Sequence, residues 1–534
     1  MMMLHSDKKE RMAVALFMIL ITLIGLWTIG DYTGSYDEIA EQAILASNMK
    51  EYAVRLQKIG VCSEYWTNAP VQPISQSVEK DHGISAYYLF GVLFPLLENN
   101  EWLRYTLWSV FTWLWFMMGV WSLYAISKRM GASRPVACLA CLVLYLSPRF
   151  FADGHVNNKD VVLLCLMLVT LWQGMRFLEC MSIKRGVLFS VAGAIAMNTK
   201  IVGALAWGTV LLCASVKIFL EGENCFKKIK ILLWTALFFV ISYICLTPAL
   251  WFDPLNFFSY LFGNATAFSR WSGTIFFRDA SFQIPENPLP IYYLVYMMLV
   301  TLPLYVFPLS MVGQLDAIRL FIQKPKSFFV SEKGLLLAAA TMCWTISVGA
   351  FILFRPVVYN GWRHFYFSFA GIVIMAAYGI DVVWRACRKH MWLKRICAAV
   401  LSLCFMSTAI GMIHNHPHQS SYYNVLSGDL AMETDYWNTS GTYALKRLIG
   451  SEERNKELPI EVGCYFLDIQ NARFKLPAEQ KNLLTTTVEK TSPYLYYIEN
   501  YVQVYNVPKP EGYHVLFTVE SYGRLIGTMY ERDF

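Results

Sequence analysis

Long apolar blocks recur from residue 12 to residue 413, and they constrain the fold more than any other feature of the chain. Most of these blocks have the length of about 20 residues that a helix needs to cross a membrane. Of the 534 residues, 56% are hydrophobic and only 16% are charged, whereas about a quarter of the residues in soluble domains are charged. The sequence therefore predicts a polytopic α-helical membrane protein.

Lys and Arg collect in every second loop between the apolar blocks, and this alternation predicts the orientation. Basic loops stay on the cytoplasmic side of a membrane, so the net charge of +7 needs no nucleic acid to explain it. The blocks give about eleven spans, with the N-terminus cytoplasmic and the C-terminus outside. The predicted spans are 12–30, 106–127, 135–148, 161–178, two within 186–220, 231–250, 290–315, 335–354, 365–384 and 396–413.

Residues 186–220 need two spans because the loops on both sides of them are basic. The turn between these two spans falls near Asn198-Thr199-Lys200, which exposes Lys200 on the outer side. Residues 149–160 form a polar outer loop after a short span. The long outer loop 31–106 should contain interfacial helices over 38–59 and a half-helix over 84–97.

The last part of the chain has a different composition, which predicts two domains. Residues 1–413 form the transmembrane catalytic domain, and 414–534 form a small extracytoplasmic α/β domain. We expect one helix over 441–450, and a turn at Tyr522-Gly523 between the last two strands. The predicted strands are 460–467, 494–501, 513–520 and 524–530.

Two adjacent carboxylates, Asp37 and Glu38, follow the first span directly. One interpretation is structural, because acidic residues favour the positive N-terminal end of a helix. The other is catalytic, because a carboxylate can accept the proton of an attacking hydroxyl. The rest of the chain favours catalysis.

Other unusual polar residues also lie at the outer ends of spans, and most of the span centres carry no ionisable group. Ion-coupled transporters place such groups at mid-membrane, so this distribution favours an interfacial enzyme. Arg and Lys there would suit a phosphate. Structural readings remain for single residues: Asp160 could cap a helix, and Lys159 and Lys200 could extend to the headgroups. The candidates for binding donor phosphate and substrate are Arg363, His364, Lys200, Lys159, His82, Asp153 and Asp160.

Three further segments carry a family resemblance. They are Ser147–Ala152 with Asn157–Asp160, Gly-Trp-Arg-His-Phe-Tyr-Phe at 361–367, and Tyr422-Tyr423-Asn424 with Asp435–Trp437. Together with Asp37-Glu38, this ordered set resembles the GT-C membrane glycosyltransferases. That superfamily includes protein O-mannosyltransferases and lipid A aminoarabinose transferases. The closest likeness is to bacterial family-39-type enzymes, and it covers roughly residues 12–440.

The resemblance implies a GT-C-like fold in a bacterial inner membrane and an inverting sugar transfer from a polyprenyl-phosphate carrier. Asp37 would then act as the general base on the acceptor hydroxyl. The acceptor could be a lipid, a glycan or a protein. No cofactor is required, and metal dependence stays open because Asp153 and Asp160 could approach Asp37 in space. The alternatives are a flippase or transporter of lipid-linked sugars, and a scaffold that presents the C-terminal domain.

Overall fold

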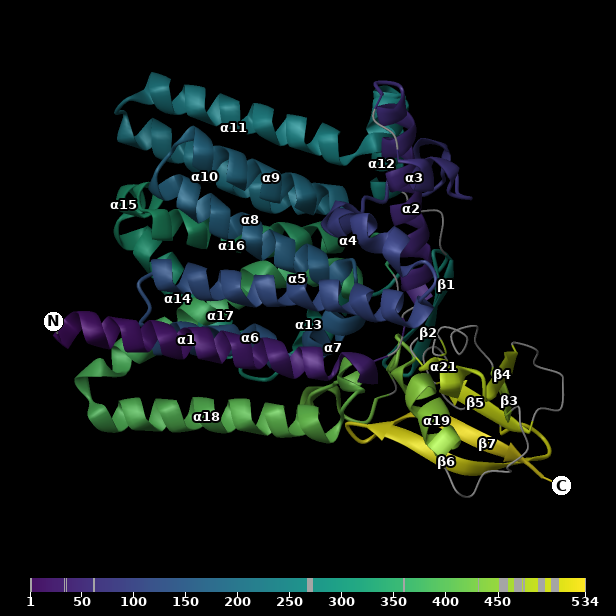
Figure 1. The fold of residues 1–534 in the computed structure, drawn as a ribbon. Coiled ribbons are helices and arrows are strands. Elements are labelled where there is room, and N and C mark those ends of the chain that lie inside the picture. Colours follow the sequence, from purple (N-terminus) through teal and green to yellow (C-terminus); the bar gives the residue numbers. More distant parts are fainter. Residues whose placement is uncertain are drawn as a thin grey trace.

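The computed structural model describes residues 2–32, 34, 36–60, 63–266, 272–358, 361–430, 432–450, 460–464, 473, 476–487, 495–500 and 509–533. Long helices run side by side in a bundle, and a small domain with a sheet lies at one end, which we call the domain end (Figure 1). The N-terminus lies at the opposite end of the bundle (Figure 1).

Eight helices in the described part of the chain are long and apolar enough to cross a membrane. This confirms the predicted fold class. The eight helices are α1 (Met2–Trp27), α5 (Glu101–Arg129), α8 (Asp160–Glu179), α10 (Ala204–Glu221), α11 (Cys225–Leu246), α16 (Glu332–Phe354), α17 (Phe369–Ala386) and α18 (Met391–His414).

Two bent helix pairs raise the number of possible spans among the described residues to ten. A further apolar helix, α9 (Ile183–Thr199), packs against α11, and the chain turns back into α10 after Lys200, as predicted. The count of about eleven spans stays a prediction.

The first bent pair corrects the predicted polar loop at 149–160. Helix α6 (Arg134–Tyr145) is followed by α7 (Pro148–Val156) at an angle of 70°, so most of that segment is a buried helix. Proline has no N–H to continue a helix but fits the first turn of the next one, which explains the break before Pro148. The second pair, α13 (Tyr293–Thr301) and α14 (Val306–Gln323), bends by 115°, so the predicted span 290–315 is broken between these two helices.

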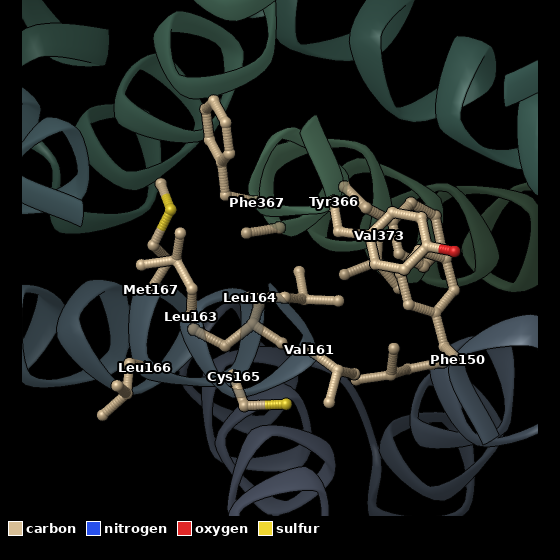
Figure 2. Close-up of a cluster of buried hydrophobic side chains, with 14 of the residues drawn as sticks. Phe150, Val161, Leu163, Leu164, Cys165, Leu166, Met167, Tyr366, Phe367 and Val373 are labelled. Carbon is tan, nitrogen blue, oxygen red and sulfur yellow. The ribbon is translucent and has the colours of Figure 1, made fainter. Parts of the chain in front are cut away.

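Helices α8 and α17 form the centre of the bundle, because most of their residues are buried. Figure 2 shows side chains of α8 packed against Phe150 of α7, Tyr366 and Phe367 of η7 (Arg363–Ser368), and Val373 of α17. In contrast, α1, α11 and α18 leave many large apolar side chains exposed, as a lipid-facing helix should. This packing fixes the ends of α7, α8 and η7, which supply the site.

The segments between the spans add short elements at the domain end (Figure 1). A helix, α2 (Tyr36–Gln57), lies where interfacial helices were expected, and 85–97 forms a short apolar helical segment that includes α4 (Tyr88–Leu93). Helix α3 (Glu64–Asn68), helix α12 (Pro254–Thr266) and the hairpin of β1 (Gly273–Phe277) and β2 (Ala280–Ile284) complete this layer. Helix α15 (Pro325–Val330) lies at the opposite end.

The C-terminal part is a sheet with helix α19 (Thr439–Gly450) against it, as predicted. The described strands form the order β4-β3-β5-β7-β6, in which β3 pairs in parallel with β4 and β5. Strand β4 and the short α21 (Ala478–Lys481) were not predicted, and 465–467, 494 and 501 of two predicted strands lie outside the described residues. The strands are β3 (Ile460–Cys464), β4 (Leu484–Thr487), β5 (Tyr496–Asn500), β6 (Tyr513–Ser521) and β7 (Arg524–Arg532).

Candidate active site

Arg363 brings together two segments that are far apart in the sequence. Its Nη1 lies 2.7 Å from Oδ2 of Asp37, and Nη2 donates a hydrogen bond to the hydroxyl of Tyr436. Asp37 stands in the first turn of α2, and Arg363 begins the 3-10 turn that leads into α17. The Arg363 side chain is only 8% exposed, whereas that of Asp37 is 34% exposed. The carboxylate is thus held from the protein side and open to solvent on the other.

Asp160 and Lys200 continue this arrangement of charges. Lys200, at the C-terminal end of α9, forms an ion pair with Asp160, whose other oxygen lies 3.9 Å from Nη1 of Arg363. The structural alternative for Asp160, that its side chain caps α8, is not what the structure shows, because the Asp160 side chain pairs with Lys200. The N–H groups at the start of α8 are capped by Asn157, whose Oδ1 accepts from the backbone of Asp160 at 2.7 Å.

Lys159 also belongs to this group, through a residue that the sequence did not indicate. Its Nζ lies 2.7 Å from Oε1 of Glu41, and both side chains are mostly buried. Glu41 follows Asp37 by one helical turn, so the two project from the same face of α2. We call the six residues Asp37, Glu41, Lys159, Asp160, Lys200 and Arg363 the polar cluster.

Three of the predicted site residues take other positions. Glu38 is buried and acts electrostatically on Tyr87 and Tyr105, whereas Asp37 is partly exposed and pairs with Arg363. His364 lies next to the polar cluster, where Lys200, Asp160 and Arg363 act on it. His82 is a third exposed and pairs with Glu79 at 2.9 Å, at the edge of the site.

Asp153 lies near the polar cluster, where Asp160 acts on it electrostatically, but it pairs with other partners. It is buried in α7, where its Oδ1 accepts a hydrogen bond from Nε1 of Trp437 at 2.8 Å and its Oδ2 accepts one from Asn157 at 3.2 Å. Of the nine predicted site residues, the structure therefore brings Asp37, Lys159, Asp160, Lys200 and Arg363 into one cluster, with His364 beside it.

A small, partly open pocket of about 30 Å³ lies beside Arg363. We call it the Arg149 pocket. It lies between α7, the start of η7 and the segment 420–437, and Arg363 lines it as well. Besides Arg363, its polar lining includes Arg149, Asp153, Tyr366, Ser420, Tyr423 and Glu433.

Glu433 holds the wall of this pocket together. Its Oε1 accepts the N–H of Phe276 in β1 at 3.0 Å, and its Oε2 accepts the N–H of Gly361 at 2.7 Å. Gly361 has a φ of 67°, a conformation that suits glycine, so the backbone can turn towards Arg363 at this point. Burial raises the pKa of Glu433 to about 8, against the effect of the two N–H donors.

The residues that were missed differ in how strongly the sequence indicated them. Arg149 and Tyr436 lie in two of the segments that carry the family resemblance, so the sequence could have indicated them as candidate site residues. Glu41, Ser420 and Glu433 carry no such signal, because one acidic residue or serine in a loop is common. Among the described residues, no group of three or more His, Cys, Asp or Glu side chains is arranged to hold a metal ion.

Residues 81–251 match the family model described as dolichyl-phosphate-mannose-protein mannosyltransferase. This match confirms the resemblance to the GT-C transferases that the sequence motifs indicated. The matched segment includes Arg149 and five of the predicted site residues, namely His82, Asp153, Lys159, Asp160 and Lys200.

Two solved structures are similar to the chain over most of its length. The first is ArnT from Cupriavidus metallidurans in the apo state, with 12% identity, a TM-score of 0.49, and coverage of 97% of this chain and 98% of that chain. The second is the same protein bound to undecaprenyl phosphate, with 12% identity, a TM-score of 0.45, and 97% of each chain covered. A search of curated protein sequences finds no significant match.

Proposed function

We propose that this chain is a membrane glycosyltransferase that moves a sugar from a polyprenyl-phosphate carrier to an acceptor hydroxyl. The family match supports a lipid-linked sugar donor, because the description of the matched family names dolichyl phosphate mannose, a sugar on a lipid phosphate. The observation that carries the proposal is the pairing of the partly exposed Asp37 with the buried Arg363. That pair joins a candidate base to a candidate phosphate ligand at the end of the spans.

Arg363 and Lys200 are the residues we assign to the donor phosphate, with Lys159 and His364 beside them. Arg363 presents a planar fork that suits phosphate oxygens, and Lys200 supplies a point charge. Both now pair with carboxylates at short range. An arriving phosphate would compete with Asp37 and Asp160 for these cations. The donor phosphate, which is the leaving group, and Asp37, the proposed base, would then both lie beside the guanidinium of Arg363.

Asp37 is the residue we assign as the general base. As the acceptor oxygen attacks the anomeric carbon, its proton passes to a carboxylate oxygen of Asp37, and the bond between that carbon and the phosphate oxygen breaks. Polyprenyl phosphate leaves, and the configuration at the anomeric carbon inverts. Arg363 and Lys200 stabilise the negative charge that develops on the phosphate. Glu38 faces elsewhere and takes no direct part.

The placement of the site suits a lipid-linked donor. The polar cluster lies where α8, α9 and η7 begin or end, so a phosphate bound there would sit near the headgroups while its polyprenyl chain stays in the bilayer. The opposite placement of the N-terminus and the C-terminal domain along the bundle (Figure 1) supports a cytoplasmic N-terminus with the site and residues 414–534 outside. We place the protein in a bacterial inner membrane, with a hexose or pentose as the transferred sugar and a lipid, glycan or protein as the acceptor.

Mass spectrometry of lipid and glycan products tests this function. Membranes that contain the protein, given a polyprenyl-phosphate-linked sugar, should form free polyprenyl phosphate and an acceptor heavier by one sugar. Membranes without the protein are the control. Equal products in both samples would contradict the proposed function.

A further inference from the structure

A second cavity lies at the end of the bundle opposite the candidate active site, since α8 begins at the polar cluster and ends at this cavity. Its volume is about 430 Å³, within the range of about 300–1,000 Å³ that ligand pockets have. The ends of α8 and α10 and the starts of α11 and α16 surround it. We call it the Lys217 cavity, and its charged lining residues are Lys217, Lys227, Lys228, Glu179, Glu221 and Glu332.

Lys217 is the buried cation of the cavity and is 6% exposed. Its Nζ donates hydrogen bonds to the carbonyl oxygen of Leu178 at 2.9 Å and to Oε1 of Glu332 at 2.9 Å. It also lies 3.8 Å from Oε1 of Glu221. An ammonium group has three donors, so these partners occupy it. A buried charge needs such partners, and Lys217 thus joins α8, α10 and α16 at the wall of the cavity.

The carboxylates of the cavity are paired with cations as well. Oε2 of Glu221 lies 2.6 Å from Nζ of Lys228. Glu179 pairs with two residues beside the lining, Arg129 at 3.1 Å and Arg185 at 3.5 Å. The third carboxylate is the one that the buried lysine holds. With these ion pairs the group contains five cations and three carboxylates, so its net charge is positive and attracts an anion.

Lys227 is the cation that remains open to a ligand. It is exposed and enters no ion pair with the described part of the chain. Lys227, Lys228 and Ile231 line the cavity together from α11, because residues three and four apart share a face of a helix. Lys228 keeps further donors beside its pair with Glu221. Two neighbouring ammonium groups can therefore bind the oxygens of one phosphate.

Apolar side chains next to the cavity suit the acyl chains of a lipid. Only 11% of the α11 span is buried, so this helix faces the bilayer. Phe219 of α10 and Phe226 of α11 are 85% and 84% exposed, and Trp234 is 40% exposed. Trp234 follows Lys227 by two helical turns, about 10 Å further along α11 towards the middle of the span. A headgroup in the cavity would therefore leave its acyl chains along α11.

We propose that the Lys217 cavity binds the phosphate of an anionic phospholipid. Lys227 and Lys228 bind the phosphate oxygens, the rest of the headgroup lies in the cavity, and the acyl chains lie against α11 beside Trp234. Basic pockets between transmembrane helices bind such headgroups on the cytoplasmic side of a membrane. The lipid would join the ends of four helices, so it should stabilise the bundle. The site is separate from the polar cluster, and the inference does not rest on the proposed function.

Thermal unfolding of the full-length protein in detergent, with added probes, tests this site. The three probes are dioleoylphosphatidylglycerol, dioleoylphosphatidylcholine, which has the same acyl chains but no net charge, and inorganic phosphate. The dependence of Tm on probe concentration gives the affinity for each probe. Wild-type protein should bind the phosphatidylglycerol at least about tenfold more tightly than the phosphatidylcholine. Inorganic phosphate should bind more weakly than the phosphatidylglycerol, because it has no acyl chains.

Two variants and a matched control locate the bound lipid. The double variant Lys227→Gln/Lys228→Gln should weaken phosphatidylglycerol binding at least about tenfold and leave phosphatidylcholine binding unchanged. Ile231→Trp keeps the charges but fills the cavity, so it should weaken phosphatidylglycerol binding as well. The control is Lys324→Gln/Lys326→Gln, which removes two exposed lysines at the same end of the bundle but outside the cavity, and it should change nothing.

Equal affinity of the wild-type protein for the two lipids would overturn the proposed site. Unchanged phosphatidylglycerol binding in Lys227→Gln/Lys228→Gln or in Ile231→Trp would place the lipid outside the cavity and overturn it too. So would an equal loss in the control, because surface charge alone would then explain the binding. If inorganic phosphate binds as tightly as the phosphatidylglycerol, the occupant is not a lipid and the proposal is wrong. Sugar transfer is not measured in this experiment, so the proposed function is tested separately.

Discussion

The polar cluster and the Arg149 pocket share Arg363 but satisfy their carboxylates in different ways. In the cluster, Asp37 and Asp160 are held by cations, and the pairs link α2, α8, α9 and η7. In the pocket, Asp153 and Glu433 are held by indole, amide and backbone N–H groups. The open groups there are donors on Arg149 and Ser420.

This difference separates the residues proposed for the chemistry from those that support them. Ion pairs between side chains of different elements can exchange partners when an anionic phosphate arrives, so the polar cluster suits a site where charge changes during the reaction. Hydrogen bonds from fixed N–H groups keep their geometry, so the residues around the pocket suit a wall that holds Arg363 in place. The predictions below test this division, from the largest expected effect to the smallest.

Arg363→Ala should have the largest effect of these, because Arg363 serves both regions. The substitution removes the proposed phosphate ligand and leaves Asp37 and the buried Asp160 without their shared cation. We expect transfer to fall at least about 100-fold. Arg363→Lys should recover only part of the activity, because a point charge replaces a two-pronged donor. Arg355→Ala, in the same outer segment but exposed, is the control, and equal losses in the two alanine variants would contradict the assignment.

Lys200→Ala should have a smaller effect that is confined to the cluster. It removes one charge-assisted partner of Asp160, while Arg363 remains within 3.9 Å. Transfer should fall by about tenfold or more, chiefly through weaker donor binding. Lys324→Ala, an exposed lysine at the end of α14, should leave transfer unchanged. A Lys200 variant with normal donor binding would remove Lys200 from the phosphate site.

Glu433→Gln should affect the pH dependence of stability more than the transfer. Burial raises the pKa of Glu433 to about 8, so between its ordinary pKa and pH 8 the folded protein binds more protons than the unfolded chain. Stability should therefore fall as the pH rises through this window, by up to about 1.4 kcal/mol per pH unit. Glutamine cannot ionise, so the variant should lose this dependence.

Thermal unfolding in nanodiscs between pH 5 and pH 9 measures this effect. Glutamine accepts hydrogen bonds only through its carbonyl oxygen, so one of the two backbone N–H groups loses a partner and stability drops by about 1 kcal/mol at every pH. An unchanged slope with pH in Glu433→Gln would show that Glu433 does not titrate in this range.

The sequence predicted the bundle because apolar length and basic loops are strong, local signals. It did not predict the bends at Pro148 and between α13 and α14, since apolar composition is similar in straight and broken spans. The hairpin of β1 and β2 was also missed, although a turn with positive φ at Arg278 and Asp279 closes it.

The candidate site was predicted in part for a related reason. Charged residues at span ends are conspicuous in an apolar chain, which is why Asp37, Asp160, Lys200 and Arg363 were found. Which of them meet depends on tertiary packing, and a single sequence does not show it. Glu41 and Glu433 were missed because their roles depend on partners more than 70 residues away, Lys159 and Gly361.

The turnover of Asp37→Asn tests the central claim most directly. The variant keeps the shape of the side chain and loses the base, which should reduce sugar transfer by at least about 100-fold. Undecaprenyl phosphate binding and protein level in the membrane should stay close to wild type, and Glu38→Gln, a matched change on the buried neighbour, should cost much less. Near-normal turnover in Asp37→Asn, with only a loss of stability of about 1 kcal/mol, would show that Asp37 merely starts α2 and would contradict the account.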